Sequence, residues 1–297
     1  MRKMMLLCNM NVTNLGLFPC VMGIVNVTTD SFHAASRVTE EGALRARVRQ
    51  ILDEGGTMVD VGACSTRPGS PSVSQDIELQ RLGWALPIVR EEVEAWATAH
   101  GATERPLVSV DTFRAAVAEA SVRQWGADIV NDISGGTIEP AILDVVARTQ
   151  APYIMMHMRG TPLDMQQLTD YPRGVVAEVG DFFDRQIALL GEACCRAGTS
   201  LPPVVLDPGF GFAKTVDQNY ELMAGMDRLR QRFEGWPVLV GVSRKSMIQR
   251  VLDVDASHAL NGTTVLNTYA LLHGASILRV HDVREAVEAM KICGRLA

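Results

Sequence analysis

The sequence predicts a single α/β domain with the architecture of a TIM barrel, that is, a (β/α)8 barrel with eight parallel strands. Eight short apolar runs alternate with segments whose apolar residues recur at helical spacing. Such alternation is typical of a parallel sheet with right-handed crossovers. Eight units within 297 residues favour a closed barrel over an open sheet. The alternative is a Rossmann-like sheet, but the first run is not followed by a Gly-x-Gly-x-x-Gly turn.

Each expected strand is an apolar run with a polar residue or glycine at or next to its end. In chain order the expected strands are residues 21–27, 58–62, 107–111, 129–132, 153–157, 204–207, 238–242 and 276–280. Helical spacing between them is carried by residues such as Leu44, Val48, Ile51 and Leu52, then Leu82, Leu86, Val89 and Val93, and later Val175, Val179, Phe182 and Leu190. We see no linker or low-complexity segment. The expected organisation is therefore an N-terminal extension over residues 1–19 and one barrel domain over 20–297.

Composition restricts the class of function. The formal net charge is −6 and no segment concentrates Lys and Arg, which argues against a nucleic-acid partner. The apolar start is too short for an export signal, and no run reaches the roughly 18 apolar residues of a membrane span. The six cysteines lack metal-ligand spacing, which is typical of a reduced intracellular chain. We expect a cytoplasmic protein without a membrane or nucleic-acid partner.

Polar residues end nearly every expected strand, namely Asn26, Asp60, Asp111, Asn131, His157, Asp207, Ser243 and His281. In barrels of this class the active site is built at the carboxyl ends of the strands. Any one of these residues could simply cap a helix or turn the chain. That explanation is weak for eight at one rim, because a buried carboxylate is costly without a partner. We expect Asp111, Asn131, Asp207 and Lys245 to converge on the barrel mouth.

These residue types suit a nitrogen heterocycle. Carboxylates and a carboxamide can accept its N–H donors, while a lysine donates to its carbonyl or ring nitrogen. The last two strands end in Ser243-Arg244-Lys245-Ser246 and in Arg279-Val280-His281, and the loops after strands seven and eight commonly form a phosphate site. Arg67, Arg279 and His281 are left to hold an anionic group. Polar loops over 28–37 and 63–70 are candidate lids, or else ordinary surface connections.

Taken together, these residues resemble dihydropteroate synthase over about residues 20 to 290. The matching motifs are Met22-Gly23-Ile24-Val25-Asn26-Val27-Thr28 with Asp30-Ser31-Phe32, Ser65-Thr66-Arg67-Pro68-Gly69, Ser109-Val110-Asp111-Thr112, Asn131-Asp132-Ile133-Ser134-Gly135-Gly136, Met156-His157-Met158, Asp207-Pro208-Gly209-Phe210-Gly211-Phe212, Ser243-Arg244-Lys245-Ser246 and Arg279-Val280-His281-Asp282-Val283. The resemblance implies a transferase of folate biosynthesis, usually a homodimer. It would condense 6-hydroxymethyl-7,8-dihydropterin diphosphate with 4-aminobenzoate to 7,8-dihydropteroate and diphosphate.

The resemblance also implies residue roles. Residues implied to bind the pterin are Asp111, Asn131, Asp207 and Lys245, with Met156 lining the pocket. Those implied to meet the diphosphate are Asn26, Arg67, Arg279 and His281, with Mg2+ as cofactor helped by Asn26. Those implied to border 4-aminobenzoate are Thr66, Pro68, Phe212 and Ser246. The catalytic set is then Lys245, Arg67, Asn26, Arg279 and His281, and the hypothesis for the reaction is an Mg-assisted dissociative substitution.

The chain departs from the family pattern in two loops. Thr29 stands where the family usually has Pro, and Cys64 replaces a residue that is commonly Glu. These changes leave loop flexibility and sulfonamide sensitivity open. Two alternatives remain, a pterin-dependent methyltransferase and a non-catalytic pterin-binding paralogue. The motifs around Arg67 and Lys245 argue against the first, since a methyltransferase needs no diphosphate site, and their intactness argues against the second.

Overall fold

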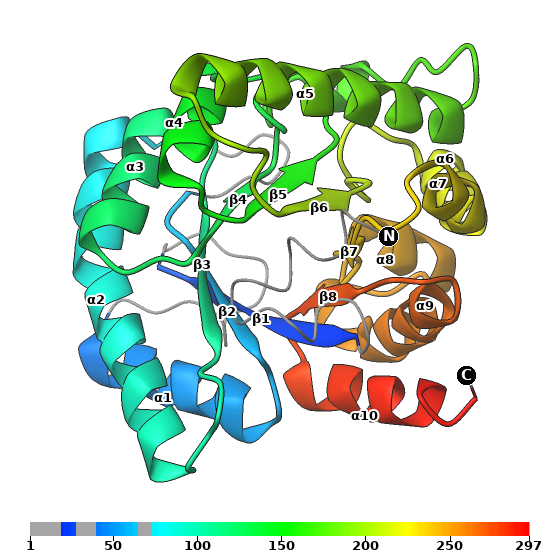
Figure 1. Ribbon diagram of the computed structural model, residues 1–297. Coiled ribbons are helices and arrows are strands. Elements are labelled where there is room, and N and C mark those ends of the chain that lie inside the picture. Colours follow the sequence, from blue (N-terminus) through cyan, green and yellow to red (C-terminus); the bar gives the residue numbers. More distant parts are fainter. Residues whose placement is uncertain (1–18, 28–39, 65–72, 297) are drawn as a thin grey trace.

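A parallel eight-stranded sheet closes on itself inside a ring of helices in the computed structural model, which describes residues 19–27, 40–64 and 73–296 (Figure 1). The strand order is β6-β5-β4-β3-β2-β1-β8-β7. Between the two ends of this order, a parallel bridge joins Leu206 to Val238 and closes the ring. The predicted (β/α)8 barrel is therefore confirmed.

The elements alternate along the chain as the sequence predicts. The strands are β1 (Cys20–Asn26), β2 (Met58–Gly62), β3 (Leu107–Asp111), β4 (Ile129–Asp132), β5 (Tyr153–Met156), β6 (Val204–Asp207), β7 (Leu239–Val240) and β8 (Ile277–Val280). The helices are α1 (Glu41–Asp53), α2 (Gln75–Ala99), α3 (Ala115–Gln124), α4 (Ala141–Thr149), α5 (Val175–Ala197), α6 (Val216–Ala224), α7 (Met226–Arg232), α8 (Ser246–Leu252), α9 (Leu260–Leu272) and α10 (Val283–Cys293). Short 3-10 helices span Met165–Gln167 and Ala256–His258.

The barrel interior changes from apolar to polar toward the carboxyl ends of the strands. Near the amino ends the buried side chains of one cluster fill the interior, namely Met22, Met58, Ile129, Ile154, Val205, Leu239 and Ile277. Because side chains alternate along a strand, the residues two places further on also face inward. These are Ile24, Asp60, Asn131, Met156, Asp207, Gly241 and Arg279. The strand pattern therefore places an apolar floor beneath a set of charged and amide side chains.

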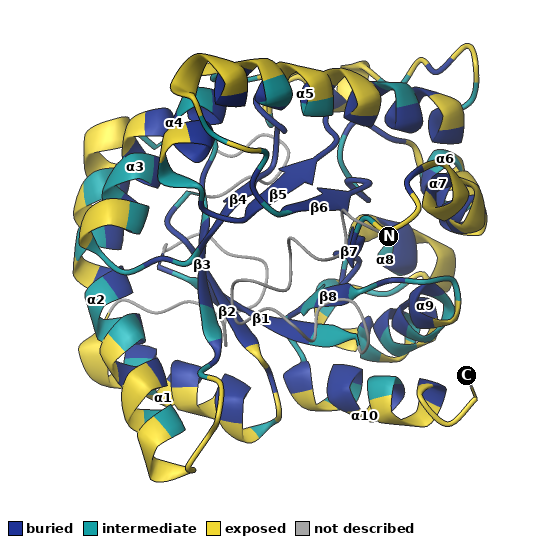
Figure 2. Cartoon of the chain, viewed as in Figure 1, coloured by how far each residue is buried: buried dark blue, intermediate teal, exposed yellow. Residues whose placement is uncertain are grey.

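The other face of the sheet packs against the helices. Outward-facing valines such as Val59 and Val108 belong to a large cluster with Leu44, Leu86 and other apolar helix residues. Figure 2 shows the resulting pattern, with buried strands and with helices that are exposed on their outer side. Within the described ranges, the helices all fall short of the length and apolarity needed to cross a lipid bilayer.

The expected seventh strand is too long. It was predicted over 238–242, whereas β7 covers Leu239–Val240 and Val238 forms the separate bridge to β6. The reason is a turn toward α8, in which Lys245 N donates to Val242 O at 3.1 Å and Arg244 takes a φ of 55°. The expected fifth strand also ends one residue early, at Met156. Residues 1–18 of the expected N-terminal extension lie outside the described part of the chain, so that domain boundary stays a prediction.

Candidate active site

Arg279 joins three strands at the centre of the polar layer. From β8, its Nε donates to Asp60 Oδ2 on β2 at 2.6 Å, and its NH2 donates to Asp111 Oδ2 on β3 at 2.8 Å. Asn131 on β4 adds a bond from Nδ2 to the same Asp60 oxygen at 3.0 Å. The Asp60 side chain is fully buried and that of Arg279 is 20% exposed. A guanidinium between two carboxylates thus holds Asp111 and Asn131 in one network.

Lys245 and Asp207 lie beside this network. Lys245 precedes α8, and its Nζ donates to the carbonyl oxygen of Phe210 at 2.6 Å. Asp207 ends β6 and accepts a bond from the backbone N–H of Gly209 at 2.8 Å. Glycine at position 241 leaves room here, since an added Cβ would lie 3.8 Å from Arg279 Cβ and 3.9 Å from Lys245 Nζ. The side chains of Arg279 and Lys245 therefore both lie beside Gly241, and the charge of Arg279 adds to the effect of burial in lowering the pKa of Lys245.

Burial moves the pKa values of these groups toward neutral pH. It raises the pKa of Asp111 to about 7, against the opposing effect of Arg279. It also raises the pKa of Asp207, although the charge of Lys245 opposes the shift. Burial lowers the pKa of Lys245 to about 8, while Asp207 and Asp111 act in the other direction. Groups tuned to titrate near pH 7 are typical of functional sites.

An apolar wall completes one side of the site. Met156, at the end of β5, belongs to a cluster with Ile133, Met158, Met165 and Ala213, and Phe212 packs against it. The Phe212 ring also lies beneath the Lys245 ammonium, with Nζ 4.8 Å from the ring centroid. A flat heterocycle could therefore meet apolar atoms at its faces and charged groups at its edge.

The end of β8 carries a second polar group. Ser243 Oγ lies 3.0 Å from His281 Nδ1 and accepts a bond from His281 N. The carbonyl oxygen of His281 accepts a bond from Arg47 at 2.8 Å. Asn26, at the end of β1, and Asp111 both lie beside Gly62, because a Cβ there would be 3.6 Å from Asn26 Oδ1 and 3.5 Å from Asp111 Cβ. Asn26, His281 and Arg279 thus occupy adjoining strand ends.

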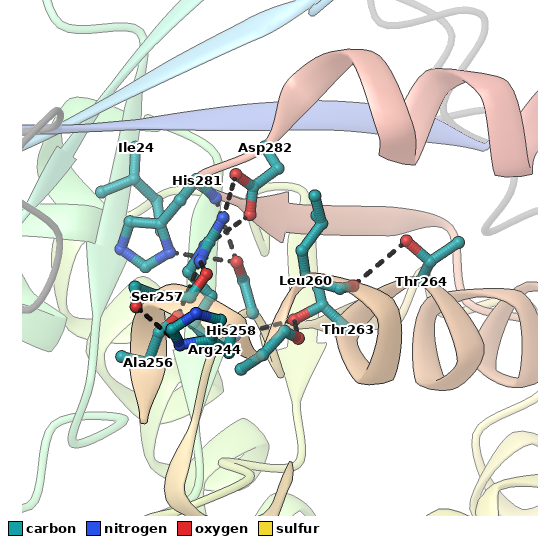
Figure 3. A network of polar contacts seen from close by, with 12 residues as sticks. Ile24, Arg244, Ala256, Ser257, His258, Leu260, Thr263, Thr264, His281 and Asp282 are labelled. Carbon is teal, nitrogen blue, oxygen red and sulfur yellow. Dashed lines mark hydrogen bonds and ion pairs between the residues drawn. The ribbon is translucent and has the colours of Figure 1, made fainter. Parts of the chain in front are cut away.

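Arg244 points away from this group, although the sequence places it next to Lys245. It forms two bonds of 2.8 Å with Asp282 and donates to the carbonyls of Ala256 and Ser257 (Figure 3). Its side chain is 8% exposed. Arg244 therefore joins the α8–α9 connection to the start of α10 and is not a ligand for an anion at the mouth.

The structure describes most, but not all, of the site residues expected from the sequence. Five of them come together in the polar layer, namely Asp111, Asn131, Asp207, Lys245 and Arg279. Met156 and Phe212 share one apolar wall, and Ser246 is exposed at the start of α8. Thr66, Arg67 and Pro68 lie outside the described residues, as does most of both candidate lid loops.

Asp60 is the residue whose role sequence reasoning missed. It was noted at a strand end but given no function, yet it is the shared partner of Arg279 and Asn131. Its Oδ1 atom is buried with no hydrogen-bond partner among the described residues. The signal was present, because Asp60 is two residues from both Met58 and Gly62 and so shares the inward face of β2 with them.

Comparison with known proteins identifies the family. The model of the pterin-binding enzyme family matches residues 22–281. The dihydropteroate synthase of Escherichia coli K12 is 40% identical over 276 residues, covering 92% of this chain and 90% of its own length. The chain belongs to the dihydropteroate synthase family.

Solved structures of dihydropteroate synthases share the fold. The Yersinia pestis dihydropteroate synthase in complex with a sulfonamide drug superposes with a TM-score of 0.80 at 38% identity, covering 94% of each chain. The Clostridium difficile dihydropteroate synthase, crystallised in the presence of pteroic acid, gives a TM-score of 0.79 at 31% identity and covers 95% of this chain and 97% of its own. Family membership makes this protein a transferase of folate synthesis that acts on small molecules.

Proposed function

We propose that the polar layer of the barrel is the pterin site of this dihydropteroate synthase. Asp111, Asn131 and Asp207 would accept or share the N–H groups along one edge of the ring, and Lys245 would donate to its oxygen or ring nitrogen. Met156 would pack against a face of the ring. The observation that carries this assignment is the convergence of these groups from strands β3, β4, β6 and the β7–α8 turn around Arg279.

The diphosphate would lie above the pterin, at the ends of β1 and β8. Asn26, Arg279 and His281 come from these strand ends, and Arg67 would join them from the β2–α2 loop. Two cations and an imidazole can balance the negative charge that grows on the departing diphosphate. Arg279 would act from a fixed position, because Asp60 and Asp111 already hold its guanidinium.

Magnesium fits the same place. Mg2+ held through substrate phosphates needs one or two protein oxygens, and Asn26 offers a carboxamide oxygen close to the Asp111 carboxylate. Among the described residues, groups of three or more His, Cys, Asp and Glu that could hold a metal by themselves are absent. When bound, Mg2+ would neutralise charge on the diphosphate leaving group. Asn26 would orient that ion, and Arg279 and His281 would share the remaining charge.

The reaction proposed for this site is a dissociative substitution. The C–O bond to diphosphate breaks first, and the electron-rich dihydropterin shares the positive charge of its methylene. The amine of 4-aminobenzoate then forms the C–N bond and loses a proton. Phe212, Ser246, Thr66 and Pro68 would border this second substrate. Inversion of configuration at an isotopically labelled methylene would argue against a free cation and for direct displacement.

The pH dependence of kcat/KM tests the proposed pterin contacts. Asp111 must be ionised to accept an N–H, so activity should fall as the pH drops below the pKa of about 7. Lys245 must be protonated to donate, so activity should also fall as the pH rises above about 8. We expect a narrow bell-shaped profile of kcat/KM against pH. The fall at acidic pH should disappear in Asp111→Asn, and the fall at alkaline pH should move to higher pH in Lys245→Arg. A flat profile from pH 6 to 9 would contradict the assignment.

The proposal includes a homodimer built on the last helices. Val265 and Leu272 on α9 and Ile292 on α10 are 59%, 53% and 64% exposed, whereas their neighbours Leu266 and Val287 pack inward. Helices α9 and α10 lie side by side (Figure 1), so these side chains could form one apolar patch. Sedimentation equilibrium tests this, with the mass of two chains as the expected result. The cytoplasmic location stays a prediction.

A further inference from the structure

Lys214 is a buried lysine within the loop that connects β6 to α6. Only 3% of the residue is exposed to solvent. Nζ donates to the carbonyl oxygens of Gly209 at 2.9 Å and Phe212 at 3.0 Å, and it lies 3.0 Å from His157 Nδ1. Three partners match the three hydrogens of an ammonium group. The lysine therefore ties both ends of the segment 209–212 to the end of β5.

The loop needs such support because its backbone is strained at Ala213, whereas its glycines adopt a positive φ freely. Gly209, Gly211 and Ala213 have φ angles of 71°, 83° and 50°. A positive φ is costly at alanine, since its Cβ crowds the carbonyl oxygen. Tyr171 Oη donates to Ala213 O at 3.0 Å, and Gly211 N donates to Asn219 Oδ1 at 2.7 Å. Bonds from outside the segment thus hold its peptide groups in one arrangement.

The same segment supplies two contacts of the active site. The carbonyl oxygen of Phe210 accepts the bond from Lys245, and the ring of Phe212 lies beneath the Lys245 ammonium. Lys214 holds the carbonyl of Gly209, which precedes Phe210, and the carbonyl of Phe212 itself. A shift of this segment would move the Phe212 ring and the acceptor of Lys245 together.

His157 is the third partner of Lys214. Burial lowers the pKa of His157 well below its usual value, with the charge of Lys214 acting in the same direction, so the imidazole is neutral. Its ring packs edge-on against Phe182, with centroids 4.9 Å apart. Burial also lowers the pKa of Lys214, against the charge of Asp207. An ammonium can donate to Nδ1, and a neutral amine can accept from an Nδ1–H, so the contact persists in either state.

We infer that Lys214, resting on His157, is a positioning residue that sets the Phe210–Phe212 segment for the binding of 4-aminobenzoate. This inference rests on the function proposed above, because Phe212 borders the second substrate there. It assigns no substrate contact to Lys214, whose bonds are directed to the loop and to His157. The predicted consequence is a larger effect on the second substrate than on the pterin, since the pterin-binding side chains of β3 and β4 stay in place and, of the pterin-binding residues, only Lys245 and Asp207 bond the segment.

Lys214→Met removes the donors and keeps an unbranched side chain of similar length. We expect KM for 4-aminobenzoate to rise roughly tenfold, while the dissociation constant of the pterin diphosphate changes less than about threefold. Lys291→Met is the matched control, since Lys291 is exposed on α10, and it should leave both constants unchanged. Equal constants in Lys214→Met and the unsubstituted protein would overturn the inference. A parallel rise of both constants would also overturn it, because it would indicate a general loss of structure.

A pair of substitutions at His157 keeps the test valid if Lys214→Met does not fold. Asn offers an oxygen close to the position of Nδ1, whereas Leu offers no acceptor. We expect KM for 4-aminobenzoate to stay close to normal in His157→Asn and to rise in His157→Leu, and equal values in both would overturn the inference. Failure of the proposed function would look different, because the unsubstituted protein itself would then release no diphosphate.

Discussion

Replacing Lys245 with methionine is expected to lower kcat/KM for the pterin diphosphate roughly 10- to 100-fold, because a hydrogen bond from a charged group contributes about 1.5–3 kcal/mol and each 1.4 kcal/mol is about tenfold. Lys245 is placed to donate to the pterin and opposes the raised pKa of Asp207. Its loss should therefore also leave Asp207 more protonated and less able to accept. Steady-state kinetics at pH 7.5 with saturating 4-aminobenzoate measures the effect.

Lys245→Arg is a second variant that tests the role of the ammonium group. It keeps a positive charge over the Phe212 ring but replaces a compact ammonium with a planar fork. We expect intermediate activity, with thermal stability close to that of the unsubstituted protein. Lys245→Met activity within twofold of normal would show that the lysine does not contact the pterin in the transition state.

Arg279→Met is expected to destabilise the fold by about 3–5 kcal/mol at pH 7.5, the range found when one partner of a buried ion pair is removed. The arginine binds Asp60, which is fully buried, and Asp111. Without it, two carboxylates would face each other inside the barrel. Urea unfolding followed by circular dichroism measures the loss. Arg196→Met is the matched control, since Arg196 is 62% exposed in its pair with Asp144 and such surface pairs contribute about 0–1 kcal/mol.

The stability lost in Arg279→Met should depend on pH in a defined direction. Loss of Arg279 removes the charge that opposes burial at Asp111, so the pKa of Asp111 should rise beyond its value of about 7. A group with a raised pKa in the folded state contributes its stability at low pH and loses it as the pH rises. Arg279→Met should therefore be less destabilising at pH 5.5 than at pH 7.5. An equal loss at both values would show that the carboxylates are not the cause.

The fold could be predicted almost completely from the sequence, because its evidence is local. Each strand is an apolar run with a polar end, and each helix repeats its apolar residues at a fixed spacing. The exception, β7, is short because the turn at Arg244 starts earlier than hydrophobicity suggests. A run of valines does not reveal where a backbone begins to turn.

The sequence predicted which side chains form the site, but it did not predict how they are connected. Strand ends and family resemblance named Asp111, Asn131, Asp207, Lys245 and Arg279. The link through Asp60 depends on strand register around a closed barrel, which joins residues far apart in the sequence.

The same limit applies to basic residues outside the site. Arg244 is adjacent to Lys245 in the chain but bonds Asp282, and Lys214 contacts His157, which is 57 residues away in the sequence. Charge in a motif indicates the presence of a cation, while its partner must be read from the structure.

The most direct test of this account is to incubate the purified protein with 6-hydroxymethyl-7,8-dihydropterin diphosphate, 4-aminobenzoate and Mg2+ and to measure both products. The account predicts diphosphate and 7,8-dihydropteroate in equal amounts, formed only with 4-aminobenzoate present and formed much more slowly by Lys245→Met. A protein that binds the pterin diphosphate at the barrel mouth but forms no dihydropteroate would contradict it.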